Sequence, residues 1–340
     1  MLQPTTSRRA RRLTLAAAAT LVAGLAAAAA PASAAPASAA SHHPARPPAP
    51  RITRAACGVT ATVHLHGRVF HVHMRGRFGI VPQRGRKIGR DQPVGGHHCR
   101  QGAGPDQVSG ALTYNGGPVA TTPTVYLDFW GSQWDSDANG VQQYLGSLFS
   151  GLGDSSDTWS TTMTQYTDGS GNPVSFGGGV LAGTWVDDSS AAPQSASQAD
   201  LAAEAQNAAS HFGVSGPDAD IFVVSPSGTQ PDGFPNAGFC AWHDWNGTTA
   251  YTNMPYVLDA GASCGANSVQ NQLDGFSIVG GHEYAEAVTD PEPSSGWVDN
   301  GNGEEIGDLC AWTGLQAISL DTGSFAMQPL WSDNDGGCVQ

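Results

Sequence analysis

One stretch of the chain combines residue types that bind metals and transfer protons. It covers residues 277–291 (SIVGGHEYAEAVTDP), in which His282 and Glu286 are four positions apart. On a helix, residues at this spacing lie one turn apart on the same face, so both can reach one ion. Glu283 occupies the position at which H-E-x-x-H metallopeptidases carry their general base. Because carboxylate oxygens are ordinary zinc ligands, Glu286 can replace the second histidine of that motif.

A third ligand is expected from the acidic run at residues 305–310 (EIGDLC). Either Glu305 or Asp308 would join His282 and Glu286 around a Zn²⁺ ion and leave one position open for water. The sequence therefore predicts a zincin-like site.

Catalysis at such a site would need a base and an oxyanion partner. Glu283 would take a proton from the attacking water and pass it to the leaving amine. Tyr284 or His243 would stabilise the oxyanion, because no Lys or Arg follows residue 100. Serine hydrolase chemistry is disfavoured, because the chain has no G-x-S-x-G sequence. These assignments indicate a zinc-dependent peptidase acting on a peptide or protein.

Other interpretations of the same residues stay open. Two carboxylate ligands would make a zinc-bound water less acidic, and Ca²⁺ held by Glu286, Glu305, Asp308 and the loop at 299–304 is an alternative, with His282 outside the ligand set. Without a metal, Glu286 could share a proton with Glu305 or Asp308. The motif could also be a solvated helix face. The apolar, small residues around it favour a packed helix, in which unpaired charges are costly.

The first 40 residues have the features of a secretory signal peptide. Arginines at positions 8, 9, 11 and 12 precede an apolar run at 13–30, and small-residue cleavage sequences follow at 32–34 and 37–39. The run consists mostly of Ala, which argues against a permanent membrane anchor. We therefore expect a secreted, extracellular protein.

Six cysteines suit an oxidising compartment. The sequence alone does not decide how they pair. Pairing nearest neighbours places one bridge in each region of the chain, and this gives the hypothesis Cys57–Cys99, Cys240–Cys264 and Cys310–Cys338.

Charge divides the chain into two parts. All 15 Lys and Arg lie before residue 101, and all 29 acidic residues except Asp91 lie after it. A body this acidic is not expected to bind nucleic acid or an anionic membrane. We predict a basic module at 41–105 and an acidic, monomeric domain at 106–340. The module would be a pro-segment that shields the site until it is cleaved, or an accessory domain that binds anionic extracellular polymers.

Hydrophobic patterning predicts the elements that position the site. Residues 60–74 alternate in the manner of a β-hairpin, and we interpret their four histidines as a polar strand face rather than a metal ladder. In the acidic domain, strands are predicted at 124–130, before Val186 and at 220–225, helices at 141–149, 200–212 and 268–289, and a loop-rich region between residues 225 and 268. This order indicates an α+β layered domain, rich in loops, with the motif helix packed beneath a twisted sheet.

The acidic domain resembles the EXORDIUM, or phosphate-induced protein, family over much of residues 111–340. The resemblance is carried by these motifs: Tyr114-Asn-Gly-Gly-Pro118, Gly238-Phe-Cys240, Gly281-His-Glu283 with Glu286 and Asp290-Pro291, Trp297, Glu305-Ile-Gly-Asp-Leu-Cys310, Phe325, Gln328, Trp331-Ser332 and Cys338. It implies secretion and association with the cell wall, without a settled enzymatic activity. The chain departs from the family in its basic module and in having one cysteine after Phe239. A non-catalytic extracellular protein, whose motif helix is braced by a cation or by hydrogen bonds, is therefore the alternative to a peptidase.

Overall fold

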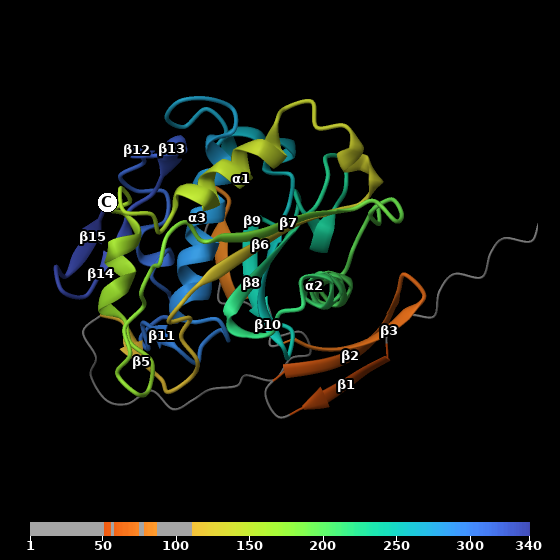
Figure 1. Ribbon diagram of the computed structural model, residues 1–340, viewed down its shortest axis with the longest axis horizontal. Coiled ribbons are helices and arrows are strands. Elements are labelled where there is room, and N and C mark those ends of the chain that lie inside the picture. The colour runs from red at the N-terminus through yellow and green to blue at the C-terminus, as the bar shows by residue number, and fades with distance from the viewer. Residues whose placement is uncertain (1–50, 56–57, 75–77, 87–110) are drawn as a thin grey trace, which may run out of the picture. The chain divides into compact units, whose positions relative to one another are not determined.

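The computed structural model describes residues 51–55, 58–74, 78–86 and 111–340 (Figure 1). The described residues belong to one compact unit. The predicted signal peptide, Cys57 and Cys99 lie outside the described residues.

A mixed six-stranded sheet forms the centre of this unit, in the order β4-β9-β10-β8-β6-β7. The strands are β4 (Phe78–Pro82), β6 (Thr124–Trp130), β7 (Leu181–Asp187), β8 (Gly216–Val224), β9 (Phe239–Trp245) and β10 (Thr249–Met254). Strands β10, β8, β6 and β7 run parallel, whereas β9 is antiparallel to β10 and β4 is antiparallel to β9. The parallel strands are rich in β-branched and aromatic residues, as strands buried on both faces usually are.

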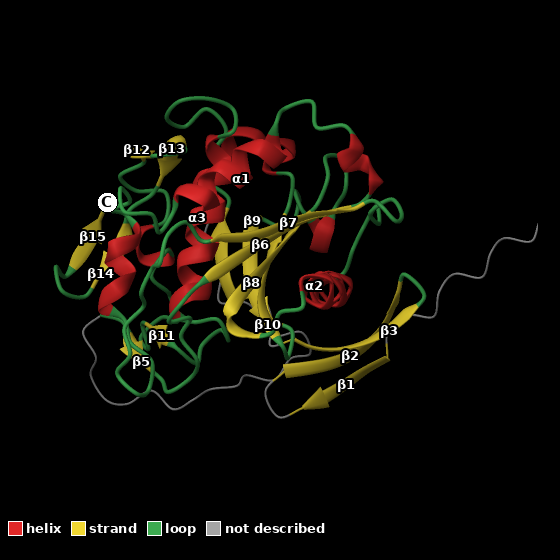
Figure 2. Cartoon of the chain, viewed as in Figure 1, coloured by secondary structure: helices red, strands yellow, loops and turns green. Residues whose placement is uncertain are grey.

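Three α-helices cover this sheet. They are α1 (Val141–Gly151), α2 (Gln198–Phe212) and α3 (Asp274–Thr289). Helices α1 and α3 lie on one side and α2 lies on the other (Figure 2). All 16 residues of α3 are buried, which explains its small and apolar composition. Helix α2 begins with a capping box between Ser197 and Asp200 and ends at Gly213, whose φ of 71° suits glycine.

The N-terminal strands form a second sheet against α2. Strands β1 (Arg51–Ala55), β2 (Gly58–Leu65) and β3 (Arg68–Met74) are antiparallel, and β2 and β3 pack on α2. The tight turn of the β2–β3 hairpin is His66-Gly67, and both residues have positive φ. The histidines at 64 and 71 are exposed, in keeping with the predicted polar strand face.

Strand β4 departs from the predicted division of the chain. The sequence places residues 78–82 in the basic module of 41–105, yet β4 is an edge strand of the central sheet. Pairing with β9 gives this segment hydrogen bonds that a separate module would lack.

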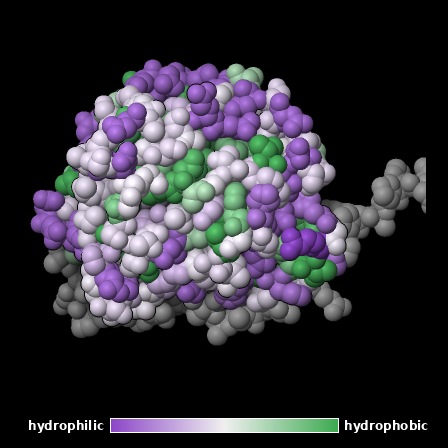
Figure 3. All heavy atoms as spheres, in the orientation of Figure 1, coloured by the Kyte–Doolittle hydropathy of each residue, from purple (hydrophilic) through white to green (hydrophobic). Residues whose placement is uncertain are grey.

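Short elements complete the fold. Strand β5 (Thr113–Tyr114) pairs with β11 (Trp297–Val298), β12 (Gln316–Leu320) with β13 (Gly323–Met327), and β14 (Leu330–Ser332) with β15 (Gly337–Val339). Disulfides Cys240–Cys264 and Cys310–Cys338 confirm two of the expected pairs. Among the described residues, the exposed large hydrophobic side chains are Val69 and Val269, and polar residues interrupt the apolar areas in Figure 3. No helix in the described part of the chain is both apolar enough and long enough to cross a bilayer.

The α+β class is confirmed, as are the strand at 124–130 and the helices at 141–149 and 200–212. The motif helix begins at Asp274 rather than at 268. The Asp274 carboxylate accepts hydrogen bonds from the amides of Val269, Gln270 and Asn271, and this folds the preceding residues into turns. The region between residues 225 and 268 is less loop-rich than predicted, because it contains β9 and β10.

Candidate metal centre

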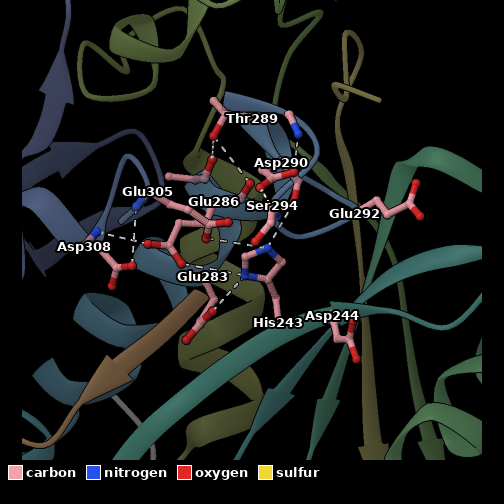
Figure 4. Close-up of polar contacts among 12 residues, drawn as sticks. His243, Asp244, Glu283, Glu286, Thr289, Asp290, Glu292, Ser294, Glu305 and Asp308 are labelled. Carbon is pink, nitrogen blue, oxygen red and sulfur yellow. Dashed lines mark hydrogen bonds and ion pairs between the residues drawn. The ribbon is translucent and has the colours of Figure 1, made fainter. Parts of the chain in front are cut away.

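A glycine in the motif allows helix α3 to pack closely against strand β13. A Cβ at Gly281 would lie 2.2 Å from Cε of Met327 on β13. Glycine therefore lets the helix approach β13 closely. His282 and Glu286 then project from one face of α3, and Figure 4 shows Glu286 among Glu283, Glu305 and Asp308.

His282, Glu286 and Asp308 converge. Nε2 of His282 lies 2.8 Å from Oε1 of Glu286 and 3.5 Å from Oδ1 of Asp308. Ligand atoms of these three residues all lie within 4.8 Å of one another. Two ligands at about 2.0–2.2 Å from a tetrahedral zinc ion would be about 3.3 Å apart. The three side chains therefore fit one ion.

Gln328 orients the His282 ring. Nε2 of Gln328 donates to the Gly307 carbonyl at 2.8 Å, so Oε1 of Gln328 faces Nδ1 of His282 at 3.2 Å. Nδ1 then carries a proton, and Nε2 is buried against the carboxylates of Glu286 and Asp308. This is the arrangement of a metal-binding imidazole with a partner for its other nitrogen.

Gly307 allows the loop at residues 305–308 to pass close to His282 and Glu286. A Cβ at this position would lie 2.9 Å from Oε1 of Glu286 and 2.9 Å from Cγ of His282. The loop therefore passes against the two ligands, and it brings the Asp308 amide to Oε1 of Glu286 at 3.0 Å. Only glycine fits this approach without displacing the ligands.

Glu283 and His243 form a second group beside the first. Strand alternation directs His243 of β9 toward α3. Its Nδ1 lies 3.3 Å from Oε2 of Glu283 and 3.7 Å from Oε2 of Glu286. Its Nε2 lies 3.2 Å from the Asp290 carbonyl. The amide of Val81 on β4 donates to Oε1 of Glu283 at 3.4 Å.

Glu305 lies on the His243 side of the centre. Its Oε2 is 3.9 Å from Nε2 of His243, whereas Asp308 joins His282. Of the two candidate third ligands, the structure thus brings Asp308 to the pair on α3. The neighbouring Asp290 accepts from the amides of Ser294, Ser295 and Gly296 just after the helix ends.

Two predicted participants lie elsewhere. The Tyr284 ring faces the core, where it contacts Phe149 at 5.9 Å between ring centroids. The loop at 299–304 forms hydrogen bonds within itself, with Asp299 accepting from Gly301 and Asn302 donating to Glu304. Neither feature joins the group around His282.

Burial sets the electrostatics of the centre. It raises the pKa of Glu283 and Glu305 well above the usual carboxyl range, and the charge of Glu286 adds to both shifts. Burial also raises the pKa of Glu286 to about 7, with Asp308 as the next contribution. Burial alone would lower the pKa of His282, but Glu286 and Asp308 together raise it above its usual value. A cation or bound protons must therefore balance these carboxylates.

Sequence reasoning missed Gln328, Gly307 and Val81 as parts of the centre. Gln328 and Gly307 lie in motifs that carry the family resemblance, and this resemblance could have pointed to them. No sequence pattern could have pointed to Val81, because Val81 contributes a backbone amide. Comparison with protein-family models, curated proteins and solved structures finds no match for this chain.

Proposed function

We propose that this protein is a secreted, zinc-dependent peptidase, with His282, Glu286 and Asp308 as the metal ligands. The observation that carries the proposal is the environment of His282. Its buried Nε2 lies 2.8 Å and 3.5 Å from two carboxylate oxygens, while its Nδ1 is held by Gln328. A nitrogen donor favours zinc over calcium, which prefers a shell of oxygen ligands.

Zinc, when bound, supplies Lewis-acid chemistry to a carbonyl group and to water. The remaining chemistry belongs to the chain. Glu283 follows the ligand His282, and its carboxylate is buried beside His243. A carboxylate in this position can take a proton from water and return it to a leaving amine. His243 holds Glu283 in place and is the remaining candidate for an oxyanion partner.

The contacts of strand β4 with the rest of the protein support a role for the N-terminal segment as a pro-segment. Strand β4 pairs with β9, which carries His243, and its Val81 amide contacts the proposed base Glu283. Trp312 donates to the Pro82 carbonyl at 2.6 Å, and the Arg84 guanidinium lies 5.2 Å from the Trp312 ring centroid. We infer that β4 covers the centre in this form and that a peptide substrate would need it displaced.

The test uses the full chain with a specific protease site inserted between residues 91 and 105. After cleavage, high salt would weaken the attraction between the basic segment and the acidic body, and the body would be assayed on casein. We expect hydrolysis by the wild type and a loss of about 100-fold or more in Glu283→Gln with unchanged zinc content. Glu292→Gln is the matched control, because Glu292 points away from the cluster in Figure 4.

A second candidate function rests on a specific observation. His282, Glu283 and Glu286 are all 0% exposed, as in a site that braces a fold. In this alternative a cation fixes α3 and the loop around Gly307, and the protein acts without catalysis, as the EXORDIUM resemblance implies. Zinc-loaded, cleaved wild type that hydrolyses nothing between pH 3 and pH 8 would favour it over the peptidase.

A further inference from the structure

A second group of metal-binding side chains lies on the α2 side of the central sheet. Asp187 ends β7, Glu204 lies on α2, and His66 lies at the turn of the β2–β3 hairpin. Asp187 is 2% exposed and Glu204 is 0% exposed. The group shares no residue with the centre on α3.

The two carboxylates approach the same nitrogen. Nε2 of His66 lies 3.0 Å from Oδ2 of Asp187 and 3.2 Å from Oε2 of Glu204. These distances are close to the separation of about 3.3 Å between two ligands of a tetrahedral zinc ion. The three ligand atoms lie within 4.8 Å of one another.

A third buried acid, Asp128, lies beside Glu204 and Asp187. Asp128 of β6 is 0% exposed, and neither of its carboxylate oxygens has a hydrogen-bond partner in the described structure. Burial raises its pKa well above the usual range, and the nearby Glu204 and Asp187 charges add to the rise. Asp128, Asp187 and Glu204 thus form a group of buried acids beside a single imidazole, and a divalent ion would offset their charge.

Neighbouring groups orient the ligands as in known metal sites. The Ser189 hydroxyl lies 3.1 Å from Nδ1 of His66, which leaves Nε2 to face the acids. Asn207 donates to Oδ2 of Asp187 and to Oε1 of Glu204, at 3.3 Å each. Partners of this kind hold ligands in place in metal sites. A hollow of about 450 Å³, lined by His64, His66, Ser189 and Trp130 among others, opens beside His66.

We propose that His66, Asp187 and Glu204 form a second transition-metal site of the zinc class, with Asp128 as a further carboxylate donor. The bound ion would fasten the β2–β3 hairpin to α2 and β7. It would thereby hold the N-terminal segment on the acidic body. This site does not depend on the proposed peptidase activity.

The test is a zinc titration of the metal-stripped full chain, followed by native mass spectrometry. We expect His66→Ala and Asp187→Asn each to bind one zinc ion fewer than the wild type. His71→Ala should match the wild type, because His71 is exposed and lies outside the group. Zinc ions bound by other histidines are present in both the variant and the wild type, so they cancel when the two stoichiometries are compared.

The outcomes separate the two sites. His282→Ala should lose the ion at the α3 centre and keep the ion at His66. If the α3 centre binds no zinc, His66→Ala should still bind one zinc ion fewer than the wild type. If folded His66→Ala and Asp187→Asn both bind as many zinc ions as the wild type, the second site does not exist. Circular dichroism of each variant establishes that it is folded.

Discussion

The Val81 amide donates a hydrogen bond to Oε1 of Glu283 at 3.4 Å, although the two residues are 202 positions apart in the sequence. This contact links the N-terminal segment directly to the proposed base on α3. Because the Val81 N–H is directed to Glu283, proline at this edge-strand position would remove that bond.

Val81→Pro should loosen β4. A hydrogen bond contributes about 0.5–1.5 kcal/mol, so opening should become roughly two- to tenfold more frequent. Hydrogen exchange of the β4 and β9 amides would measure this, and casein hydrolysis should rise in parallel. Val81→Ala keeps the N–H and is the control. Equal exchange rates in both variants would show that the contact does not hold β4 in place.

Gln328→Leu should weaken zinc binding at the α3 centre by about 10–100-fold, because Nδ1 of His282 loses its partner. Competition with a chromophoric chelator measures the affinity. Gln272→Leu, at an exposed glutamine, should leave it unchanged. Unaltered affinity in folded Gln328→Leu would contradict the orientation assigned to His282.

Gly307→Ala should displace the ligands, because the added Cβ would lie 2.9 Å from Oε1 of Glu286. Overpacking of this kind costs about 1–3 kcal/mol in the free energy of unfolding, and zinc affinity should fall by about tenfold or more. Gly146→Ala on α1 is the control, because a Cβ there meets nothing within 4 Å. Thermal unfolding and zinc titration of both variants would decide. A Gly307→Ala protein that matches Gly146→Ala in both would refute the close approach.

Asp220 should make stability depend on pH. Burial raises its pKa to about 8, against the hydrogen bond from Thr252. The unfolded chain releases this proton near pH ~4. Between these values the native state binds more protons, so the free energy of unfolding falls as pH rises, by at most about 6 kcal/mol over the window.

Asp220→Asn removes this titration. Relative to wild type, the variant should gain stability steadily from pH 5 to pH 8 in urea unfolding experiments. Asp321→Asn, at an exposed turn, should show no such trend. A difference between Asp220→Asn and wild type that is the same at pH 5 and pH 8 would contradict the assignment.

Short-range sequence patterns predicted the features that depend on residues close together in the chain. The four-residue spacing of His282 and Glu286 predicted a shared helix face, and the apolar spacing at 141–149 predicted α1. The region that became β9 and β10 was harder to predict. Its strands are buried on both faces, so sequences such as FCAWHDW lack the alternation of a half-buried strand.

Contacts between distant segments could not be predicted. Nothing in residues 78–82 indicates pairing with β9, because edge-strand pairing uses backbone groups that every residue has. The second group joins His66 to Glu204, 138 positions away, without a motif at either end. The choice of Asp308 over Glu305 likewise depends on how the loop turns at Gly307.

The account rests on a cation shared by His282, Glu286 and Asp308. The most direct test is an anomalous difference map from zinc-equilibrated crystals, collected on both sides of the zinc absorption edge. We predict a peak about 2 Å from Nε2 of His282 and in contact with both carboxylates, absent below the edge and in His282→Ala crystals. Wild-type crystals with no peak there, or with a water hydrogen-bonded to Nε2 instead, would contradict it.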